Sequence, residues 1–278
     1  MGKSASRVRS IVRAFALVCF GGGVAAASMA GWLSLSHLRD VELLREQALA
    51  VTTSAPTAGQ KLELLNTWVY ANKGFAKNPR YFGFSSLGPT PIDVLEAGGD
   101  CADKSRLLSS MLRTIGIESS LAMLYPCPDC DPEHTVVIAK SEEGWIVADP
   151  VYNVMFPEVG GGYMTVGRLM ASDDVLTQRL RQLKADRGPG DKINEYELSL
   201  LHYRYLTTVN WNKNVATRLV AGTLEHLGHD PRIVPRPQPL EDPKYALEWL
   251  CALLALALLG IGALSALLSA RISTLRAR

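Results

Sequence analysis

Two long stretches of the chain contain no charged residue. They cover residues 14–36 and 249–270, and each exceeds the roughly 20 apolar residues that an α-helix needs to cross a bilayer. The second stretch is rich in Leu and Ala, which favour helix. In the first, the glycine run 21–23 weakens a helix, and Ser28-Met29-Ala30 offers a small-residue cleavage site. We expect a membrane helix at both places, and a cleaved signal peptide is the alternative for the first.

The segment between these stretches combines helical and strand-like patterns. Apolar residues recur at helical spacing in residues 61–75 and most clearly in 101–116, where Asp100 is a candidate N-cap and Gly116 a candidate C′ glycine. Three strand-like segments follow, of which the last two are joined by a short turn; they are residues 117–125, 134–140 and 144–150. Residues 168–183 and an interrupted region over 195–228 again favour helix. This order predicts an α+β fold.

Charged residues are sorted along the chain. Residues 1–13 carry four Lys and Arg, residues 271–278 carry three, and neither end carries an acid. Residues 37–248 hold the other 22 Lys and Arg and all 27 Asp and Glu, so this segment has a net charge of −5 in a chain of +2. Because Lys and Arg gather on the cytoplasmic side of membrane helices, we expect both termini in the cytoplasm and the middle segment outside. An acidic middle segment also excludes nucleic-acid binding, which requires a basic face.

Cys101, His134 and Asp149 form a candidate catalytic triad. Cys101 falls at the start of the predicted helix 101–116, and the partial positive charge of a helix N-terminus favours a thiolate. If residues 141–144 form a four-residue turn, residue 140 lies opposite residue 145, and His134 and Asp149 become diagonal neighbours on one face. A one-residue slip would place them on opposite faces.

The segments that carry these residues resemble the transglutaminase-like core of papain-type cysteine enzymes. The resemblance spans about residues 62–170, and its motifs are Gly-Gly-Asp-Cys opening a Leu-rich helix that ends in Gly-Ile, a His that begins a strand, and Gly-Trp leading into a strand that ends in Asp-Pro. It implies a nucleophile helix packed on an antiparallel sheet. It also implies that Cys101 is the nucleophile, His134 the general base and acid, and Asp149 the residue that orients His134. In the family the cysteine's backbone N–H and a polar side chain upstream hold the oxyanion, and we name Tyr81 as candidate for that side chain. Thr135 stands where the family often has an aromatic residue.

Cys127 and Cys130 form a Cys-x-x-Cys pair four residues before His134. A disulfide is the favoured interpretation in an oxidising compartment. Free thiols, and a metal or redox site, are the alternatives. A fourth metal ligand is not evident in the sequence, and no cofactor is expected.

The resulting prediction is a membrane-anchored bacterial cysteine enzyme of the inner membrane, with its domain in the periplasm. It would act on an amide or ester bond of a protein or peptide, as a hydrolase or an acyl transferase. The alternative is a catalytically inactive scaffold between two membrane helices, with partners in an envelope or polysaccharide-export assembly. We expect these segments along the chain: a basic start 1–13, a membrane helix 14–36, a stalk 37–60, a core 61–170, a helical extension 171–230, a Pro-rich linker 231–248, a membrane helix 249–270 and a basic tail 271–278.

Overall fold

The computed structural model describes residues 2–84, 87–212 and 215–274. It divides into two compact units. The first contains residues 1–39 and 243–278, and the second contains residues 40–242.

The first unit is a pair of long helices. They are α1, Gly2–Thr52, whose last part belongs to the second unit, and α9, Pro243–Thr274. By length and composition both can cross a membrane, with mean hydropathies of 1.8 and 2.5 over their apolar segments. Both extend beyond the charge-free stretches, because neighbouring residues with good helix propensity continue the helix.

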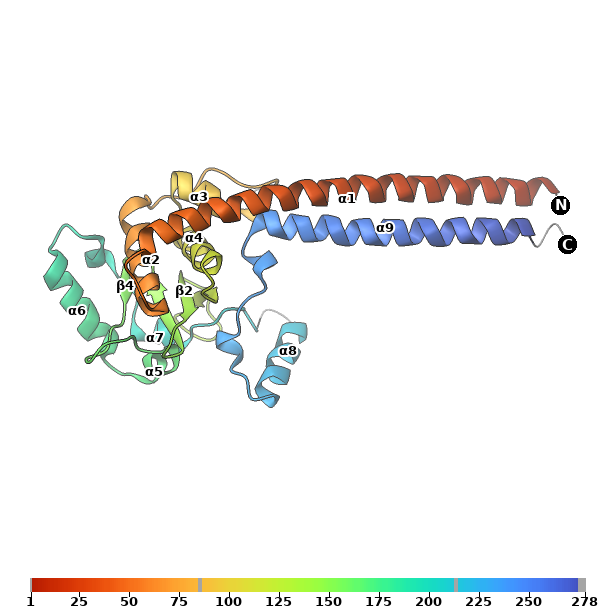
Figure 1. Cartoon of the computed structure of the whole chain (residues 1–278). Helices are drawn as coiled ribbons and strands as arrows, with labels where there is room; N and C mark the ends of the chain where they lie inside the picture. Colours follow the sequence, from red (N-terminus) through yellow and green to blue (C-terminus); the bar gives the residue numbers. More distant parts are fainter. Residues whose placement is uncertain (1, 85–86, 213–214, 275–278) are drawn as a thin grey trace. The chain divides into compact units, whose positions relative to one another are not determined.

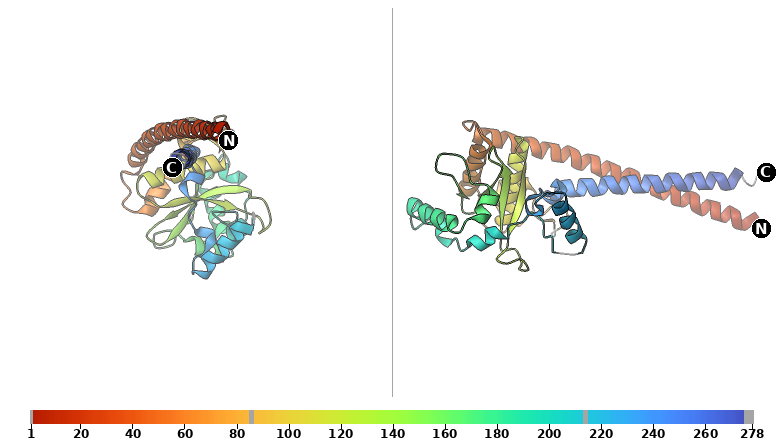
Figure 2. Two further views of the ribbon diagram at one scale, coloured as in Figure 1. Left: turned by 90° about the vertical axis from the view of Figure 1, so that its right-hand side faces the viewer. Right: turned by 90° about the horizontal axis from the view of Figure 1, so that it is seen from below.

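Glycines allow the two helices of this unit to approach each other (Figure 2). A Cβ on Gly23 would lie 2.7 Å from Leu259 Cγ, and a Cβ on Gly262 would lie 3.3 Å from the carbonyl oxygen of Ala16. The glycine run at 21–23 therefore does not interrupt α1. It lies where α9 packs, as small residues commonly do between membrane helices.

The second unit is an α+β domain around a four-stranded antiparallel sheet of order β1-β2-β3-β4 (Figure 1). The strands are β1 Ser119–Leu124, β2 His134–Lys140, β3 Trp145–Asp149 and β4 Val154–Met155. The helices are α2 Ala58–Asn72, α3 Pro91–Ala97, α4 Cys101–Thr114, α5 Val166–Ala171, α6 Val175–Arg187, α7 Leu200–Arg204 and α8 Val215–His226. Short 3-10 turns are η2 Lys192–Glu195, η3 Pro231–Ile233 and η4 Gln238–Leu240.

Two apolar clusters fill this domain and hold α4 against the sheet. The first cluster joins α2 and α4 to one face of the sheet. It contains Leu107 and Met111 of α4 and Val137 of β2. The second cluster joins the other face of the sheet to α5, α6 and α7. It contains Val136 of β2 and Tyr203 of α7. The predicted helix at 101–116 and the three predicted strands are thus confirmed as α4 and β1 to β3.

Several elements differ from the sequence-based expectation. The helix expected over 168–183 is two helices, because Ser172–Asp174 interrupts it. In the described part of the interrupted helical region expected over 195–228, the α-helices are α7 and α8. α3 and the two-residue strand β4 were not expected, since both are too short to show a periodic pattern.

Candidate active site

The first turn of α4 presents Cys101. Asp100 Oδ1 accepts a hydrogen bond from the backbone N–H of Asp103 at 3.1 Å, and Asp103 Oδ2 accepts one from the backbone N–H of Asp100. This capping box fixes the helix N-terminus, whose partial positive charge stabilises an anion. Cys101 is the first helical residue and is half-buried, so it lies at this helix N-terminus.

Glycines are required where the chain enters α4. Gly98 has a φ of +76°, and a Cβ there would lie 2.6 Å from the carbonyl oxygen of Gly74. A Cβ on Gly99 would lie 2.3 Å from Asp103 Cβ. Because a side chain at position 99 would displace the cap of α4, the Gly-Gly-Asp-Cys sequence reflects a backbone requirement.

The hairpin of β2 and β3 brings His134 and Asp149 together. Lys140 pairs with Trp145, which is the register that the sequence predicted. His134 opens β2, Asp149 closes β3, and the His134 Nε2–H donates a hydrogen bond to Asp149 Oδ2 at 2.8 Å. His134 is 7% exposed and Asp149 is fully buried, so water competes little for this contact.

The turn after β3 fixes the orientation of the Asp149 carboxylate. Its Oδ1 accepts hydrogen bonds from the backbone N–H groups of Val151 at 2.8 Å and Tyr152 at 3.3 Å. The ring of Tyr152 lies 5.8 Å from that of His134. One carboxylate oxygen is therefore held by the backbone, and the other is free to orient the imidazole.

Cys101 and His134 are also neighbours. Ser105 Oγ donates a hydrogen bond to the carbonyl of Thr135 at 2.9 Å, which ties the start of α4 to the start of β2. Burial lowers the pKa of His134, but the charge and hydrogen bond of Asp149, together with those of Cys101, outweigh burial and raise this pKa to about 10. Since Asp149 occupies Nε2, the ring nitrogen left for Cys101 is Nδ1. The imidazole thus lies between the cysteine and the carboxylate, which is the order that a nucleophile, a base and an orienting group require.

Comparison with known proteins finds a family profile that matches part of the chain. Residues 45–150 match the profile of the transglutaminase-like superfamily. This segment is a transglutaminase-like superfamily domain. No curated protein matches the chain.

Two solved structures resemble the chain weakly. A "putative cysteine protease" from Cytophaga hutchinsonii is 20% identical with a TM-score of 0.34, and the alignment covers 41% of this chain and 38% of that one. A "putative protease" from Parabacteroides distasonis is 16% identical with a TM-score of 0.31, over 51% of this chain and 30% of that one. The chain thus spans about a third of the length of these proteins.

Tyr81 lies in the loop before α3 of the transglutaminase-like domain and is 57% exposed. With Asn78, Gly88 and Asp100 it lines a cavity of about 390 Å³. The cavity therefore reaches Asp100, the N-cap residue that precedes Cys101. Within the described residues, no three His, Cys, Asp or Glu side chains gather as metal ligands would.

The Cys127–Cys130 pair lies in the loop between β1 and β2. Its two sulfurs are bonded to each other, and the Cα atoms are 5.2 Å apart. The backbone N–H of Glu133, which follows this loop, donates to the carbonyl of Leu124 at 3.0 Å. The disulfide thus closes the loop that leads into His134.

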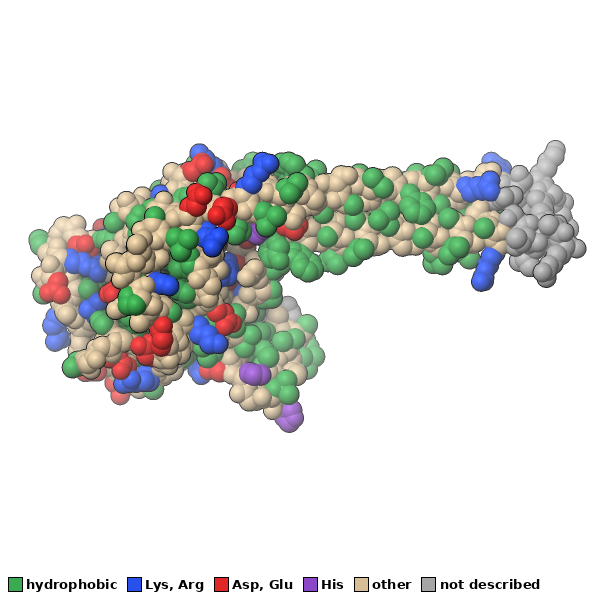
Figure 3. All heavy atoms as spheres, in the orientation of Figure 1, with side chains coloured by type: hydrophobic (Ala, Val, Ile, Leu, Met, Phe, Trp, Pro, Cys, Tyr) green, Lys and Arg blue, Asp and Glu red, His purple; other side chains and the backbone are tan. Residues whose placement is uncertain are grey.

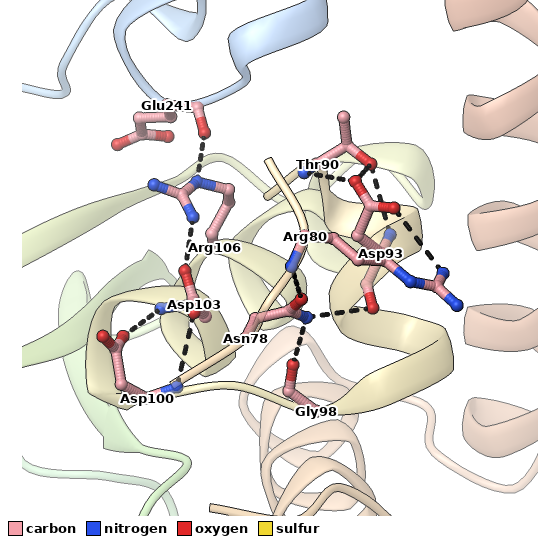
Figure 4. A network of polar contacts seen from close by, with 9 residues as sticks. All are labelled: Asn78, Arg80, Thr90, Asp93, Gly98, Asp100, Asp103, Arg106 and Glu241. Carbon is pink, nitrogen blue, oxygen red and sulfur yellow. Dashed lines mark hydrogen bonds and ion pairs between the residues drawn. The ribbon is translucent and has the colours of Figure 1, made fainter. Parts of the chain in front are cut away.

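A polar network behind the start of α4 contains residues that the sequence did not reveal (Figure 4). Arg106 Nη1 donates to Asp103 Oδ1, and Arg106 Nε donates to the carbonyl of Glu241, both at 2.8 Å. Asn78 Nδ2 donates to the carbonyl of Gly98 at 2.6 Å. The network therefore braces both the capping residue Asp103 and the glycine turn.

Glu241 is the unexpected member of this network. It lies in the Pro-rich segment that the sequence presents as a linker, yet it is 1% exposed. Its Oε1 accepts hydrogen bonds from Ser120 Oγ and the Leu121 N–H, both at 2.8 Å, and its Oε2 pairs with Arg113. The buried Glu241 carboxylate thus shows that this end of the Pro-rich segment is part of the domain.

Lys104 is a second site residue that sequence reasoning missed. It lies one turn after Cys101 on α4 and is 2% exposed. Burial and the charge of Lys192 lower its pKa to about 8, although Asp149 acts in the opposite direction. Lys192 Nζ in turn lies 3.3 Å from the ring centroid of Phe75 and 5.7 Å from that of Tyr152. Two cationic side chains thus lie near the carboxylate that orients His134.

Proposed function

We propose that the protein is a membrane-anchored cysteine enzyme whose Cys101 attacks an amide or ester carbonyl in a protein or peptide. The observation that carries this proposal is the meeting of Cys101, His134 and Asp149 at the start of α4. The half-buried thiol, the buried imidazole and the fully buried carboxylate provide a nucleophile, a base and an orienting group.

The first half of the reaction forms a thioacyl enzyme. The Cys101 proton resides on His134, and the thiolate attacks the carbonyl carbon, so that a C–S bond forms and the oxygen becomes an anion. The backbone N–H of Cys101 and the hydroxyl of Tyr81 are the proposed donors to that oxyanion. The C–N or C–O bond then breaks, and His134 gives its proton to the leaving group.

The second half releases the acyl group. Water or an amine attacks the thioacyl carbon and gives a proton to His134, and the C–S bond breaks to restore the thiolate. Water yields an acid, which makes the protein a hydrolase, whereas an amine yields a new amide, which makes it an acyl transferase. Product analysis with and without added amine distinguishes the two.

The proposed location is the bacterial inner membrane, with the domain in the periplasm. Support comes from two helices long enough to span, from basic residues at both ends of the chain, and from a disulfide, which persists in oxidising compartments. Reporter fusions after Glu248 and at Arg278 test this topology. Activity of a periplasmic reporter at the first and of a cytoplasmic reporter at the second is expected, and the reverse would overturn it.

The catalytic pair is tested by alkylation of Cys101 as a function of pH, followed by peptide mass spectrometry. The wild type should react rapidly at neutral pH, because the imidazolium of His134 stabilises the thiolate, and His134→Ala should require higher pH. His202→Ala is the matched control, since His202 is also buried and also pairs with a carboxylate, that of Glu133 at 2.9 Å. An unchanged pH profile in His134→Ala would argue against an activated cysteine. Full rescue of a deletion phenotype by Cys101→Ala would instead favour the scaffold function.

The role of Tyr81 is tested by separating alkylation from acylation. Alkylation forms no oxyanion, so Tyr81→Phe should leave its rate unchanged. The burst of p-nitrophenol from p-nitrophenyl acetate passes through an oxyanion and should slow by about 100-fold. Equal burst rates in the two proteins would exclude Tyr81 as a donor.

A further inference from the structure

Helix α8, Val215–His226, is attached to the domain by one narrow stripe. None of its residues is fully buried. Its half-buried residues are Thr217, Ala221 and Leu224, which follow one another at spacings of four and three and therefore share a face. This face packs on η3, and Thr217 Oγ1 donates a hydrogen bond to the carbonyl of Trp211 at 2.9 Å.

Outside this stripe, α8 exposes large apolar side chains to solvent. Val215, Leu219 and Val220 are 64%, 68% and 51% exposed, and Leu227 just beyond the helix is 65% exposed. Figure 3 shows hydrophobic side chains gathered over this helix. A surface helix of a soluble domain normally turns its apolar side chains inward, so these exposed apolar side chains indicate a surface that something covers.

The segment after α8 is fixed to the domain. The backbone N–H of Thr208 donates a hydrogen bond to the carbonyl of Arg232 at 2.9 Å, and Thr208 Oγ1 donates one to the carbonyl of Val234. Glu241 is buried, as described above. Because residues 231–241 are held in this way, α8 has a defined place relative to Asp242, the last residue before α9.

The short segment between α8 and α9 indicates what covers the exposed apolar side chains of α8. α9 begins at Pro243, only 17 residues after the last residue of α8, and it contains the more apolar of the two candidate spans. If α9 spans the membrane, Asp242, the last residue of the domain, lies next to the bilayer surface, and residues 227–242 connect it with α8. The lipid boundary is an apolar surface that is always present next to such a segment.

We infer that α8 is an interfacial helix that inserts the side chains of Val215, Leu219, Val220 and Leu227 into the outer boundary of the bilayer. This inference rests on the membrane anchoring in the proposed function and goes beyond it. It gives the domain a third membrane contact, besides those of α1 and α9.

Spin labels on the full chain in vesicles test the inference. The vesicles contain 70% phosphatidylcholine and 30% phosphatidylglycerol. In the background chain, serine replaces the free cysteines Cys19, Cys101 and Cys251. A single spin label is attached at one introduced cysteine, which is Leu219→Cys, Leu227→Cys, Leu256→Cys or Ala185→Cys. Leu256 lies in α9, and Ala185 lies exposed on α6 as the matched control. Collision with oxygen reports lipid, and collision with a water-soluble nickel complex reports water.

Labels at Leu219, Leu227 and Leu256 should collide mainly with oxygen, and the label at Ala185 mainly with nickel. Nickel access at Leu219 and Leu227, with Leu256 in lipid, would overturn the inference and leave the anchoring intact. Nickel access at Leu256 as well would overturn the anchoring itself. Shielding of Leu219 from both reagents, or spin–spin broadening that grows with protein density, would show a protein partner or a second copy and would also overturn the inference.

Discussion

The carbonyl oxygen of Glu241 accepts a hydrogen bond from Arg106 Nε at 2.8 Å. Arg106 also binds Asp103, the second member of the capping box at the start of the helix that begins with Cys101. Two contacts therefore connect the segment that precedes α9 with the start of the nucleophile helix. The C-terminal end of the domain thus helps to support the candidate active site.

Replacement of Glu241 by Ala should destabilise the domain strongly. The variant leaves Arg113, Ser120 Oγ and the Leu121 N–H without their partner in a buried place, which costs about 3–5 kcal/mol. Glu118→Ala is the control, because Glu118 pairs with Lys140 on the surface at 3.5 Å and is half-exposed, and should cost less than about 1 kcal/mol. Urea unfolding measures both, and equal losses would contradict the role assigned to Glu241.

Stability should depend on pH through His134. The pKa of His134 in the folded domain is raised to about 10, above the value of about 6.5 of an unfolded chain, so the folded state retains a proton that the unfolded state loses. The stabilisation is complete below pH 6.5 and is lost as the pH rises towards 10. The difference in free energy of unfolding between wild type and His134→Gln should therefore shrink over this range. A difference that stays constant from pH 6 to 10 would contradict the prediction.

The titration of Lys104 should change the free energy of unfolding in the opposite direction from that of His134. Its pKa is lowered to about 8, below the value of about 10.4 of an unfolded chain, so the buried ammonium costs stability below pH 8 and this cost disappears as the pH rises towards 10.4. Lys104→Met should raise the free energy of unfolding at pH 7 by about 1 kcal/mol or more. The exposed Lys77 is the control, and Lys77→Met should change it by less than about 0.5 kcal/mol. A destabilised Lys104→Met domain would show that the amine has a partner it needs.

Two features of the candidate site could be predicted because the rules behind them are local. Neighbouring residues determine the capping role of Asp100 at the start of α4, and they determine the register of the hairpin that brings His134 to Asp149. Glu241 and Lys104 could not be predicted, because nothing local distinguishes a buried Glu or Lys from an exposed one. Their burial depends on contacts such as that between Arg106 and Glu241, which lie 135 residues apart.

For the fold, too, the sequence predicted the long periodic elements and missed the short ones. The long periodic elements α4 and β1 to β3 were predicted, whereas α3, with seven residues, and β4, with two, were not. The break at Ser172–Asp174 was hidden, because the apolar residues on both sides fit one helical repeat although the chain turns between α5 and α6.

The disulfide should stabilise the loop before His134. In the oxidised protein, alkylation without reductant should leave Cys127 and Cys130 unmodified, and peptide masses should change only after reduction. The double variant Cys127→Ala, Cys130→Ala should lose about 2 kcal/mol, because the bond closes only a short loop. Reductant should lower the stability of the wild type by the same amount and leave the double variant unchanged. Alkylation of both cysteines without reductant would contradict the pairing.

Gly23 and Gly21 should respond differently to the same substitution. A Cβ on Gly23 would lie 2.7 Å from Leu259 Cγ and 3.2 Å from the Leu259 backbone nitrogen, whereas nothing lies within 4 Å of one on Gly21. Gly21→Ala should therefore stabilise the helix pair, by up to about 1 kcal/mol from helix propensity. Gly23→Ala gains the same propensity, but it forces α9 away and should lower the thermal midpoint in detergent micelles. Since the two positions lie within one turn of α1, an equal gain at both would show that α1 and α9 do not pack through this face.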